Sequence, residues 1–332
     1  MRALVLGGSG AAGRLIVARL RQQGATAHVA SRDPARGDRV VDLAVPATIE
    51  AALVDVDVVV NAAGVEDARL VGTVTSHGIA LVDITASTGY VAAVEALRPA
   101  APVVLSVGLA PGLTNLLAAA VHQEAPGAID LAIVLGAGER HGKAGVAWTY
   151  DLIGRSFSDP ATGAPVRNFT HGKRFPIPGV GSRLLRRADF SDQHALTRDL
   201  GVAVRTYFGL DSRLAGLTLA ALTRIPGGRR APQGLRLPGS DRWTIVAQAE
   251  GGTSRWASGH GQSRATALIA VEAARVATAA APGVHHLHQL MALADVPADV
   301  GVIGNGAIGN GSGRGMAGHV RRGHQKDRTA RP

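Results

Sequence analysis

The feature that most restricts the fold of this chain lies at its beginning, where a short apolar run is followed at once by closely spaced glycines. Residues 3–6 are apolar and predict a buried parallel strand, and residues 14–21 predict an amphipathic helix. Between them, Gly8, Gly10 and Gly13 form the spacing Gly-x-Gly-x-x-Gly. A strand, a glycine turn and a helix in this order predict the first unit of a dinucleotide-binding sheet.

The glycines of this turn have separate expected roles. Gly8 permits the tight turn, Gly10 lets a pyrophosphate approach the backbone, and Gly13 lets the helix pack close to the strand. The start of the helix offers unpaired N–H groups and positive dipole to the phosphates. The alternative is a flexible glycine-rich turn, which would not require the flanking strand and helix. The predicted cofactor-binding residues of the turn are Gly8, Ser9, Gly10, Ala11, Ala12 and Gly13.

The end of the second predicted strand, residues 25–30, bears on the identity of the nucleotide. NAD sites usually hold the ribose 2′-hydroxyl with an acid, whereas this strand runs out into Ser31 and Arg32. A hydroxyl and a guanidinium suit a 2′-phosphate, which arginine binds through charge-assisted hydrogen bonds. The sequence therefore favours NADP. NAD is the less favoured alternative, because Asp33 lies near the ~20-residue distance expected for the acid, and Arg32 would then be an ordinary solvated charge.

The ends of later strands supply further cofactor positions. We expect Asp42, at the end of a third strand, to meet the adenine, and Asn61, Ala62 and Ala63 follow a fourth strand at 57–60. Ligands of open parallel sheets bind outside the carboxyl ends of the strands, and small residues there admit a flat ring. We therefore predict that Asn61, Ala62 and Ala63 lie beside ribose or nicotinamide. A plain strand-to-helix turn is the alternative.

Strand-like and helix-like segments alternate over the first 122 residues and give six predicted strands. This alternation predicts an α/β fold with a doubly wound parallel Rossmann sheet. The patterns that follow predict a second, mixed α/β substrate domain with a hairpin around residues 250–252. The predicted units are a dinucleotide-binding domain at 1–122, a substrate domain at 123–262, a helix at 263–295 packing back on the first domain, and a glycine-rich, basic, disordered tail at 301–332.

Composition limits the remaining classes of function. The chain has no cysteine, which excludes disulfides, thiolate metal sites and a catalytic thiol. Half of the formal charge of +10 lies in residues 314–332, and aromatic residues make up 3% of the chain, so nucleic acid is not a predicted partner. No apolar run reaches the ~18 residues of a membrane span. We expect a soluble cytoplasmic protein with a small-molecule substrate, able to form a homodimer.

Three histidines, His285, His286 and His288, lie close together near the carboxyl terminus. A metal site needs further ligands at fixed geometry, and neither an HExxH pattern nor a carboxylate is adjacent. We therefore predict a helix or loop that carries histidines, and no metal site.

Four segments, residues 7–13, 60–64, 82–87 and 108–115, resemble in order and spacing the saccharopine dehydrogenase or reductase family. The resemblance implies an NADP-dependent oxidoreductase that transfers hydride to or from a small carbonyl or imine-type substrate. It also implies a mixed α/β domain that closes over the nicotinamide-binding domain. The last of the four turns tends in the family to carry an acid before the proline and an Asp-His pair after it. This chain has Ala110 there, followed by Thr114 and Asn115, so saccharopine itself is not the predicted substrate.

The candidate catalytic residues are Thr85 and Asn115, from the family-like turns, and His141 and Tyr150 in the second domain. His141 adjoins an acid and a cation between glycines, as in a substrate loop, and Tyr150 could donate to a carbonyl or imine. A polar turn and a core tyrosine are the respective alternatives. The chain contains neither Tyr-x-x-x-Lys nor Gly-x-Ser-x-Gly, which argues against short-chain dehydrogenase and simple hydrolase mechanisms. The alternative function is an NADP-binding sensor or structural protein without turnover.

Overall fold

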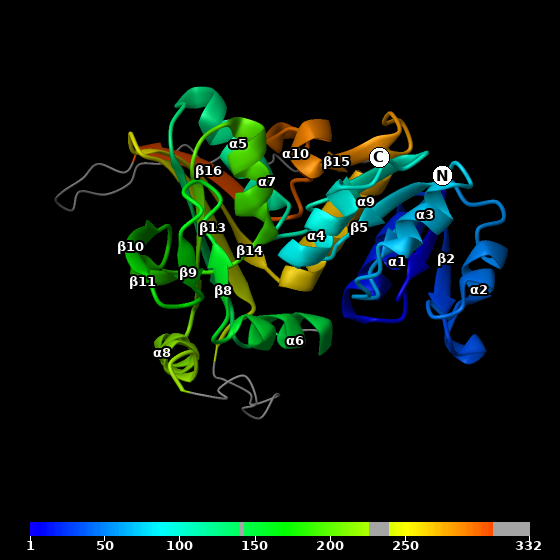
Figure 1. Cartoon of the computed structure of the whole chain (residues 1–332), viewed down its shortest axis with the longest axis horizontal. Coiled ribbons are helices and arrows are strands. Elements are labelled where there is room, and N and C mark those ends of the chain that lie inside the picture. The colour runs from blue at the N-terminus through cyan, green and yellow to red at the C-terminus, as the bar shows by residue number, and fades with distance from the viewer. Residues whose placement is uncertain (140–142, 226–238, 308–332) are drawn as a thin grey trace, which may run out of the picture.

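Two β-sheets form the two halves of the molecule, which lie side by side in Figure 1. The computed structural model describes residues 1–139, 143–225 and 239–307. One hydrophobic core runs through both halves, from Val5 in the first sheet to Ile245 in the second. The helices that fill the space between the sheets are α5 (Leu113–Glu124), α7 (Ser191–Leu200) and α9 (Gln262–Ala277).

The first sheet has seven strands in the order β15-β6-β5-β4-β1-β2-β3, and all neighbouring pairs are parallel. The chain builds outward from β1 in one direction and then resumes on its other side with β4. This reversal is the topological switch point of a doubly wound sheet, so the predicted fold class is confirmed. The strands are β1 (Arg2–Leu6), β2 (Thr26–Ser31), β3 (Arg39–Val40), β4 (Val58–Asn61), β5 (Ala80–Asp83), β6 (Pro102–Leu105) and β15 (Gly283–His286).

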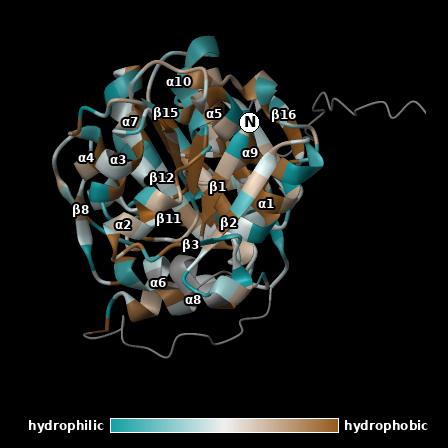
Figure 2. Ribbon diagram, turned by 90° about the vertical axis from the view of Figure 1, so that its right-hand side faces the viewer, coloured by the Kyte–Doolittle hydropathy of each residue, from teal (hydrophilic) through white to brown (hydrophobic). Residues whose placement is uncertain are grey.

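Both faces of the first sheet are buried, because helices cover each of them. Alternate residues of β1 enter different cores: Ala3 and Val5 pack with α1 and α9, whereas Leu4 and Leu6 pack with the helices of the opposite face. This arrangement explains the continuous apolar runs that predicted the strands, and Figure 2 shows them as brown ribbons inside the molecule. The further elements of this half are α1 (Ala11–Gln22), η1 (Pro34–Arg36), α2 (Pro46–Ala51), α3 (Arg69–Thr75) and α4 (Thr88–Glu95).

The second sheet is mixed, with the order β10-β11-β12-β7-β13-β14-β16. Only β12 and β7 pair in parallel among these strands, and β13 and β14 form the predicted antiparallel hairpin. The strands are β7 (Ile129–Leu135), β10 (Gly172–Ile177), β11 (Gly181–Arg187), β12 (Val204–Leu210), β13 (Arg242–Ala249), β14 (Thr253–His260) and β16 (Val302–Ala307). The smaller elements are α6 (Lys143–Leu152), β8 (Ser156–Ser158), β9 (Pro165–Arg167), α8 (Arg213–Leu222), α10 (Leu287–Leu290) and η3 (Leu293–Asp295).

After the second sheet the chain returns to the first. Helix α9 packs against α1, and its buried face consists largely of alanines, which let the two helices approach closely. The carboxylate of Glu139 accepts hydrogen bonds from the N–H groups of Gln262 and Ser263, so it caps the first turn of α9 from the second half. Strand β15 then joins the edge of the first sheet beside β6.

Two expectations for the carboxyl-terminal part are wrong. The predicted disordered tail begins at residue 301, but residues 302–307 form β16, paired with β14. A Cβ at Gly304 would lie 2.4 Å from the Trp256 ring, so the glycine lets this edge strand pack flat over the indole. Residues 308–332 lie outside the described part. The histidine cluster was expected in a helix or loop, and His288 does lie in α10, but His285 and His286 belong to β15.

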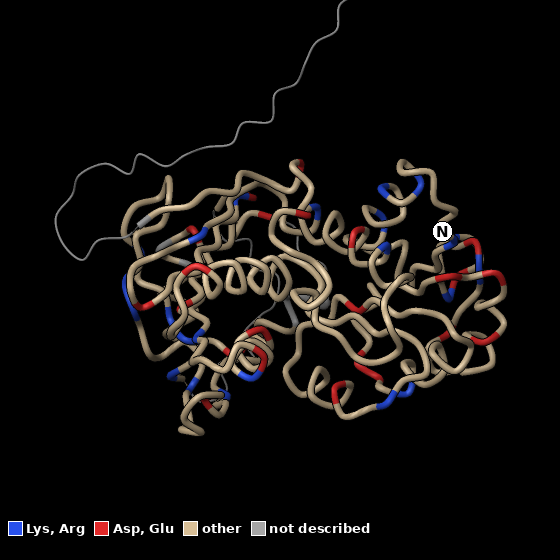
Figure 3. Tube along the Cα trace, turned by 90° about the horizontal axis from the view of Figure 1, so that it is seen from above, with Lys and Arg blue, Asp and Glu red and all other residues tan. Residues whose placement is uncertain are grey.

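Charged residues are distributed over both halves. Figure 3 shows Lys and Arg interspersed with Asp and Glu along the described chain. Many oppositely charged residues pair directly, as Arg2 does with Asp57 and Arg21 with Asp38, at 2.8 and 2.9 Å. Among the described residues, no helix combines the length and apolar character that crossing a bilayer requires.

Candidate functional site

The glycine turn connects β1 to α1, and its backbone differs from the expectation in one respect. The residue in the left-handed region is Gly7, with φ +70°, whereas Gly8 has no positive φ. The tight turn therefore depends on Gly7, which lies outside the predicted set. The N–H of Gly10 donates to the carbonyl oxygen of Gly7 at 2.8 Å and closes the turn.

Close packing explains the other glycines. A Cβ at Gly13 would lie 2.1 Å from the carbonyl oxygen of Gly7, so only glycine allows α1 to come this close to the turn. A Cβ at Gly8 would lie 3.0 Å from the Val29 side chain. A Cβ at Gly10 would meet only the Gly7 oxygen, at 3.1 Å, so its other surroundings are open. Gly7 thus forms the turn, Gly13 lets α1 pack against it, and Gly10 leaves the backbone N–H groups accessible.

The first turn of α1 has the character of an anion site. Gly10 provides the cap without a side-chain hydrogen bond, and there is no acidic residue in the first turn. The first N–H groups of a helix have no partner within it, so those of Ala11 and Ala12 can receive phosphate oxygens. Ser9 and Gly10 are exposed. These residues fit a pyrophosphate.

The end of β2 presents the residues predicted to choose the nucleotide. Arg32 is exposed and has no hydrogen bond or ion pair with any described residue. Asp33 is engaged: its carboxylate accepts from the N–H of Ala35 at 2.9 Å and contacts Arg36 at 3.3 Å, which fixes η1. The hydroxyl of Ser31 accepts the N–H of Asp33 at 3.1 Å. The Arg32 guanidinium can therefore bind a ligand at this edge of the sheet, whereas the Asp33 carboxylate is already hydrogen-bonded within the turn.

The polar side chains at the ends of β3 and β4 form hydrogen bonds to residues near them in the fold. The Asp42 carboxylate accepts the N–H of Ala44 at 3.0 Å. Asn61 is completely buried, and its amide donates to Asp83 at 2.8 Å while its oxygen accepts from Ala63 at 3.2 Å. The Asn61 side chain therefore braces the strand ends and points away from the surface. Ala62 and Ala63 are partly buried and lie against Gly7.

A buried carboxyl holds the ends of β4 and β5 together. Asp83 accepts hydrogen bonds from Asn61, from the Tyr90 hydroxyl and from the N–H of Thr85, each at 2.8 Å. Burial raises the pKa of Asp83, and these hydrogen bonds act in the opposite direction. Burial and the neighbouring Asp83 also raise the pKa of Tyr90. This network orders the loop 84–87 that leads into α4.

The predicted catalytic residues come from different elements, and two of them keep a buried polar atom that has no hydrogen-bond partner among the described residues: Oγ1 of Thr85 and Nδ2 of Asn115. Thr85 is nearly buried beside Asp83. Asn115 is completely buried, and its oxygen accepts the N–H of Gly112 at 2.9 Å, which caps the start of α5. Tyr150 is partly buried on α6 and packs against the main core. His141 lies outside the described residues.

The histidine cluster lies at the junction of the two halves. His286 is buried between the Ser106 hydroxyl and the Glu95 carboxylate, each 2.8 Å from a ring nitrogen. Glu95 also pairs with Arg198 of α7 at 2.9 Å. His288 is buried 3.3 Å from Asp199. The described residues contain no group of three or more His, Asp or Glu arranged to hold a metal ion.

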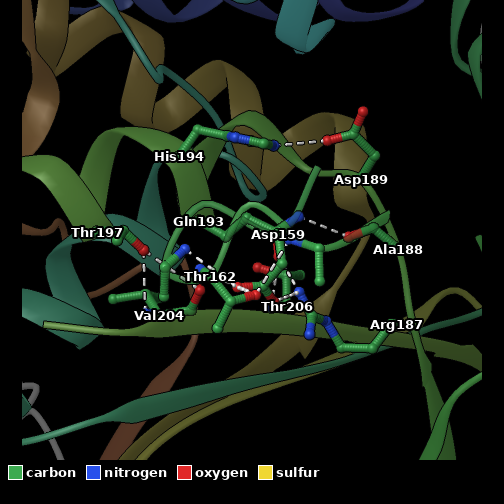
Figure 4. Close-up of polar contacts among 12 residues, drawn as sticks. Asp159, Thr162, Arg187, Ala188, Asp189, Gln193, His194, Thr197, Val204 and Thr206 are labelled. Carbon is green, nitrogen blue, oxygen red and sulfur yellow. Dashed lines mark hydrogen bonds and ion pairs between the residues drawn. The ribbon is translucent and has the colours of Figure 1, made fainter. Parts of the chain in front are cut away.

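Sequence reasoning did not predict the histidine–carboxylate pairs, and the one formed by His194 and Asp189 lies at the contact of the two halves. Nε2 of His194 in α7 lies 2.8 Å from Oδ1 of Asp189, the residue two positions before the helix begins. The same carboxylate oxygen accepts the Thr88 hydroxyl of α4 at 3.0 Å. Figure 4 shows the pair beside the buried polar groups of the second half. No motif marks these residues, and the sequence pattern around α7 does not separate helix from strand.

A buried ion pair supports the same region. The guanidinium of Arg187 donates to Asp159 at 2.9 Å and to Gln193 at 3.1 Å, and both charged side chains are at most 7% exposed (Figure 4). Burial acts to raise the pKa of Asp159, but Arg187 and the backbone N–H groups of Ala161 and Thr162 together outweigh it, so the pKa is lowered. The aromatic rings of Phe157 and Tyr207 lie 5.5 and 5.7 Å from the guanidinium. This pair anchors the strand that precedes Asp189.

Comparison with known proteins supports nucleotide binding by the half of the molecule that contains the first sheet. A model of the NAD dependent epimerase/dehydratase family matches residues 3–93, from β1 into α4. No match was found among curated proteins. The match and the glycine turn together support a nucleotide-dependent enzyme of the oxidoreductase type, and they do not separate NADP from NAD. They also do not select the saccharopine-type reaction.

Solved structures give weaker likenesses. A Lactobacillus casei protein is 28% identical over 34% of this chain and 52% of its own, with a TM-score of 0.19, so the chain spans about half of that protein. A Thermus thermophilus UDP-glucose 4-epimerase in complex with NAD is 16% identical over 68% and 84%, with a TM-score of 0.25. A probable aspartate-semialdehyde dehydrogenase from Pseudomonas aeruginosa is 10% identical over 83% and 80%, with a TM-score of 0.29. Because these scores are low, the fold assignment rests on the strand order.

Proposed function

We propose that this protein is an NADP-dependent oxidoreductase that transfers hydride to or from a small carbonyl or imine-type substrate, in the manner of the saccharopine dehydrogenase-like enzymes it resembles. Gly7 to Gly13 and the start of α1 would hold the pyrophosphate. A bound nicotinamide would supply or accept the hydride. The loops 84–87 and 108–115, which follow the carboxyl ends of β5 and β6, would border the reacting ring.

The choice of NADP rests on which of Ser31, Arg32 and Asp33 already have hydrogen-bond partners. The exposed Arg32 guanidinium has no partner among the described residues, whereas Asp33 is engaged with Ala35 and Arg36. A 2′-phosphate would give the guanidinium a doubly charged partner at the edge of the sheet. A 2′-hydroxyl would need the Asp33 carboxylate to leave its turn.

Binding measurements test this choice. We expect Arg32→Ala to weaken NADPH binding by about 10- to 100-fold, the loss of a hydrogen bond to a charged group, and to leave NADH binding within about twofold. Arg36→Ala is the matched control, because Arg36 is exposed four positions later and pairs with Asp33. Isothermal titration of both nucleotides measures the effect. Equal binding of NADH and NADPH by the native protein would refute the NADP assignment, and binding of neither would refute the cofactor site.

The second candidate is an NADP-binding sensor without turnover. One observation favours it: the turn 108–115 supplies no titratable side chain, and Asn115 is buried with its oxygen bonded to Gly112. Loss of nicotinamide absorbance with a panel of carbonyl compounds and preformed imines separates the two candidates. Turnover of any of these compounds supports the enzyme, whereas tight NADPH binding without turnover supports the sensor.

A further inference from the structure

We propose that His194 is the proton-transferring residue of this protein and that Asp189 is its positioning residue. The inference rests on the proposed oxidoreductase function and supplies the group that the turn 108–115 lacks. It concerns side chains of the second half that meet the cofactor half at one place.

The pair lies at the contact of the two halves. The Thr88 hydroxyl, on the first residue of α4, donates to Asp189, so the pair touches the element that begins where the loop 84–87 ends. Helix α7 also packs against α5, at the end of the turn 108–115. Helix α7 therefore contacts both α4 and α5, the two helices that follow the loops expected to border the nicotinamide.

The His194 ring is hydrogen-bonded through one of its two nitrogens. A carboxylate oxygen can only accept hydrogen bonds, so Nε2 of His194 carries the hydrogen that Asp189 receives. This contact fixes the orientation and the tautomer of the ring. Nδ1 makes no hydrogen bond with any described residue and is not among the fully buried polar atoms. Nδ1 is therefore the nitrogen that can exchange a proton with a ligand.

The pair is also preorganised by its neighbours. The N–H of Asp189 donates to the side-chain oxygen of Asn168 at 2.7 Å, so its backbone is held from a second direction. The ring of Phe157 packs edge-on against His194, with centroids 6.2 Å apart. The side chains of His194 and Asp189 are 29% and 18% exposed, so a ligand can reach the ring while its surroundings restrict its motion.

Reduction of a C=O or C=N bond requires a hydride on carbon, which the bound reduced nicotinamide would supply. It also requires a proton on the heteroatom, which receives the electron pair of the broken π bond. His194 supplies that proton from Nδ1 and becomes neutral imidazole. Its Nε2–H stays on the ring and keeps its hydrogen bond to Asp189. In the reverse direction Nδ1 accepts the proton of the alcohol or amine. General acid–base catalysis of this kind contributes about 10²- to 10⁴-fold.

The first measurement follows the ligand without turnover. We record histidine ring NMR spectra of the ¹⁵N-labelled full chain with and without NADP⁺, and identify signals by comparing the native protein with His194→Gln and His77→Gln. His77 is an exposed histidine just beyond the end of α3 and serves as the matched control. We expect the His194 signals to shift when NADP⁺ binds and the His77 signals to stay.

The second measurement is kinetic. We expect His194→Gln to lower kcat by about 10²- to 10⁴-fold while the Kd for NADPH stays within about twofold, and His77→Gln to change neither. If His194→Gln fails to fold, Asp189→Asn tests the same pair: a positioning role predicts a lower kcat with KM retained. Partial recovery of His194→Ala by added imidazole would identify proton transfer rather than structural support.

The possible failures are distinguishable. Native turnover that His194→Gln reduces less than threefold overturns the proton-transfer role and leaves the proposed oxidoreductase standing. NADP⁺ binding that leaves the His194 signals unmoved overturns the location of the pair. Absence of NADP⁺ binding overturns the proposed function and this inference with it.

Discussion

The two halves of the molecule build their polar sites from different parts of the polypeptide. In the first half the cofactor turn is backbone: seven consecutive residues, 7–13, whose glycines remove side chains so that N–H groups become accessible. At the junction, the site is made of side chains from separate elements, with His194 and Asp189 next to Thr88, 101 residues away from Asp189 along the chain. A backbone site is damaged by adding atoms, and a side-chain site by removing them. The predictions below test this contrast, from the largest expected effect to the smallest.

The largest effect is expected at the buried ion pair of the second half. Asp159→Ala should lower the free energy of unfolding by about 3–5 kcal/mol, because it leaves the Arg187 charge buried without its partner. Asp151→Ala is the control, since Asp151 and Arg155 form a half-exposed pair worth less than about 1 kcal/mol. Denaturant unfolding measures both. A loss at Asp159 no larger than that at Asp151 would contradict the role of the pair as an anchor.

Adding one methyl group should damage the first half. Gly13→Ala places a Cβ 2.1 Å from the Gly7 carbonyl oxygen, so the helix must move away from the turn, and we expect about 1–3 kcal/mol of destabilisation together with loss of NADPH binding. Gly72→Ala adds the same methyl group to α3, where no atom lies within 4 Å. It should stabilise the protein by up to about 1 kcal/mol and leave NADPH binding unchanged. Retained NADPH affinity in Gly13→Ala would separate this close approach from cofactor binding.

Acidification should weaken the junction. Burial and the neighbouring His286 lower the pKa of His288 to about 4. The unfolded chain, with a pKa near ~6.5, then binds more protons between pH 6.5 and 4, so stability falls as the pH falls, by about 2 kcal/mol from pH 7 to pH 5. Burial acts to raise the pKa of Glu95, but His286 and Arg198 outweigh it, and the lowered pKa adds a loss of the same sign at still lower pH.

Thermal unfolding across this pH range measures the effect. His288→Gln should flatten the dependence between pH 7 and pH 5, because the group that takes up the proton is gone. An equally steep dependence in that variant would assign the pH sensitivity to other residues.

The smallest effect is expected where the two halves touch through one hydroxyl. Thr88→Val removes the donor to Asp189 and should cost about 1 kcal/mol of stability. NADPH binding should persist, because the glycine turn is unchanged. Thr73→Val, which removes an exposed hydroxyl that bonds only within α3, should stay within about 0.5 kcal/mol of the native protein. Equal losses in the two variants would mean that the Thr88 contact adds no stability across the junction.

The sequence was most informative where structure is local. The apolar runs and the glycine spacing predicted the parallel sheet and the turn, because these features depend on neighbours within a few residues. The tight turn was assigned to Gly8, but Gly7 is the residue with positive φ, and only the backbone geometry distinguishes these adjacent glycines. Asn61 was expected at the cofactor, but its amide is committed to Asp83, whose position depends on the register of β4 and β5.

Elements that depend on distant partners could not be predicted. Strand β15 is four residues long and includes His285 and His286, so it has neither an apolar run nor a clear alternation. It becomes a strand because β6 offers an unpaired edge. The pair of Asp189 and His194 likewise reaches the contact between the two halves only because α7 packs against α4 and α5. Such residues appear ordinary until the packing of the whole chain is known.

The return of α9 and β15 to the first sheet also has a consequence for biosynthesis. As the chain leaves the ribosome, the glycine turn emerges long before the helix that covers α1 and the strand that completes the sheet, which lie in residues 262–286. Until then one face of β4 and β5 lacks its α9 cover. The sheet around the glycine turn therefore keeps apolar surface exposed until residues 262–286 are translated, and exposed apolar surface of this kind favours aggregation during folding.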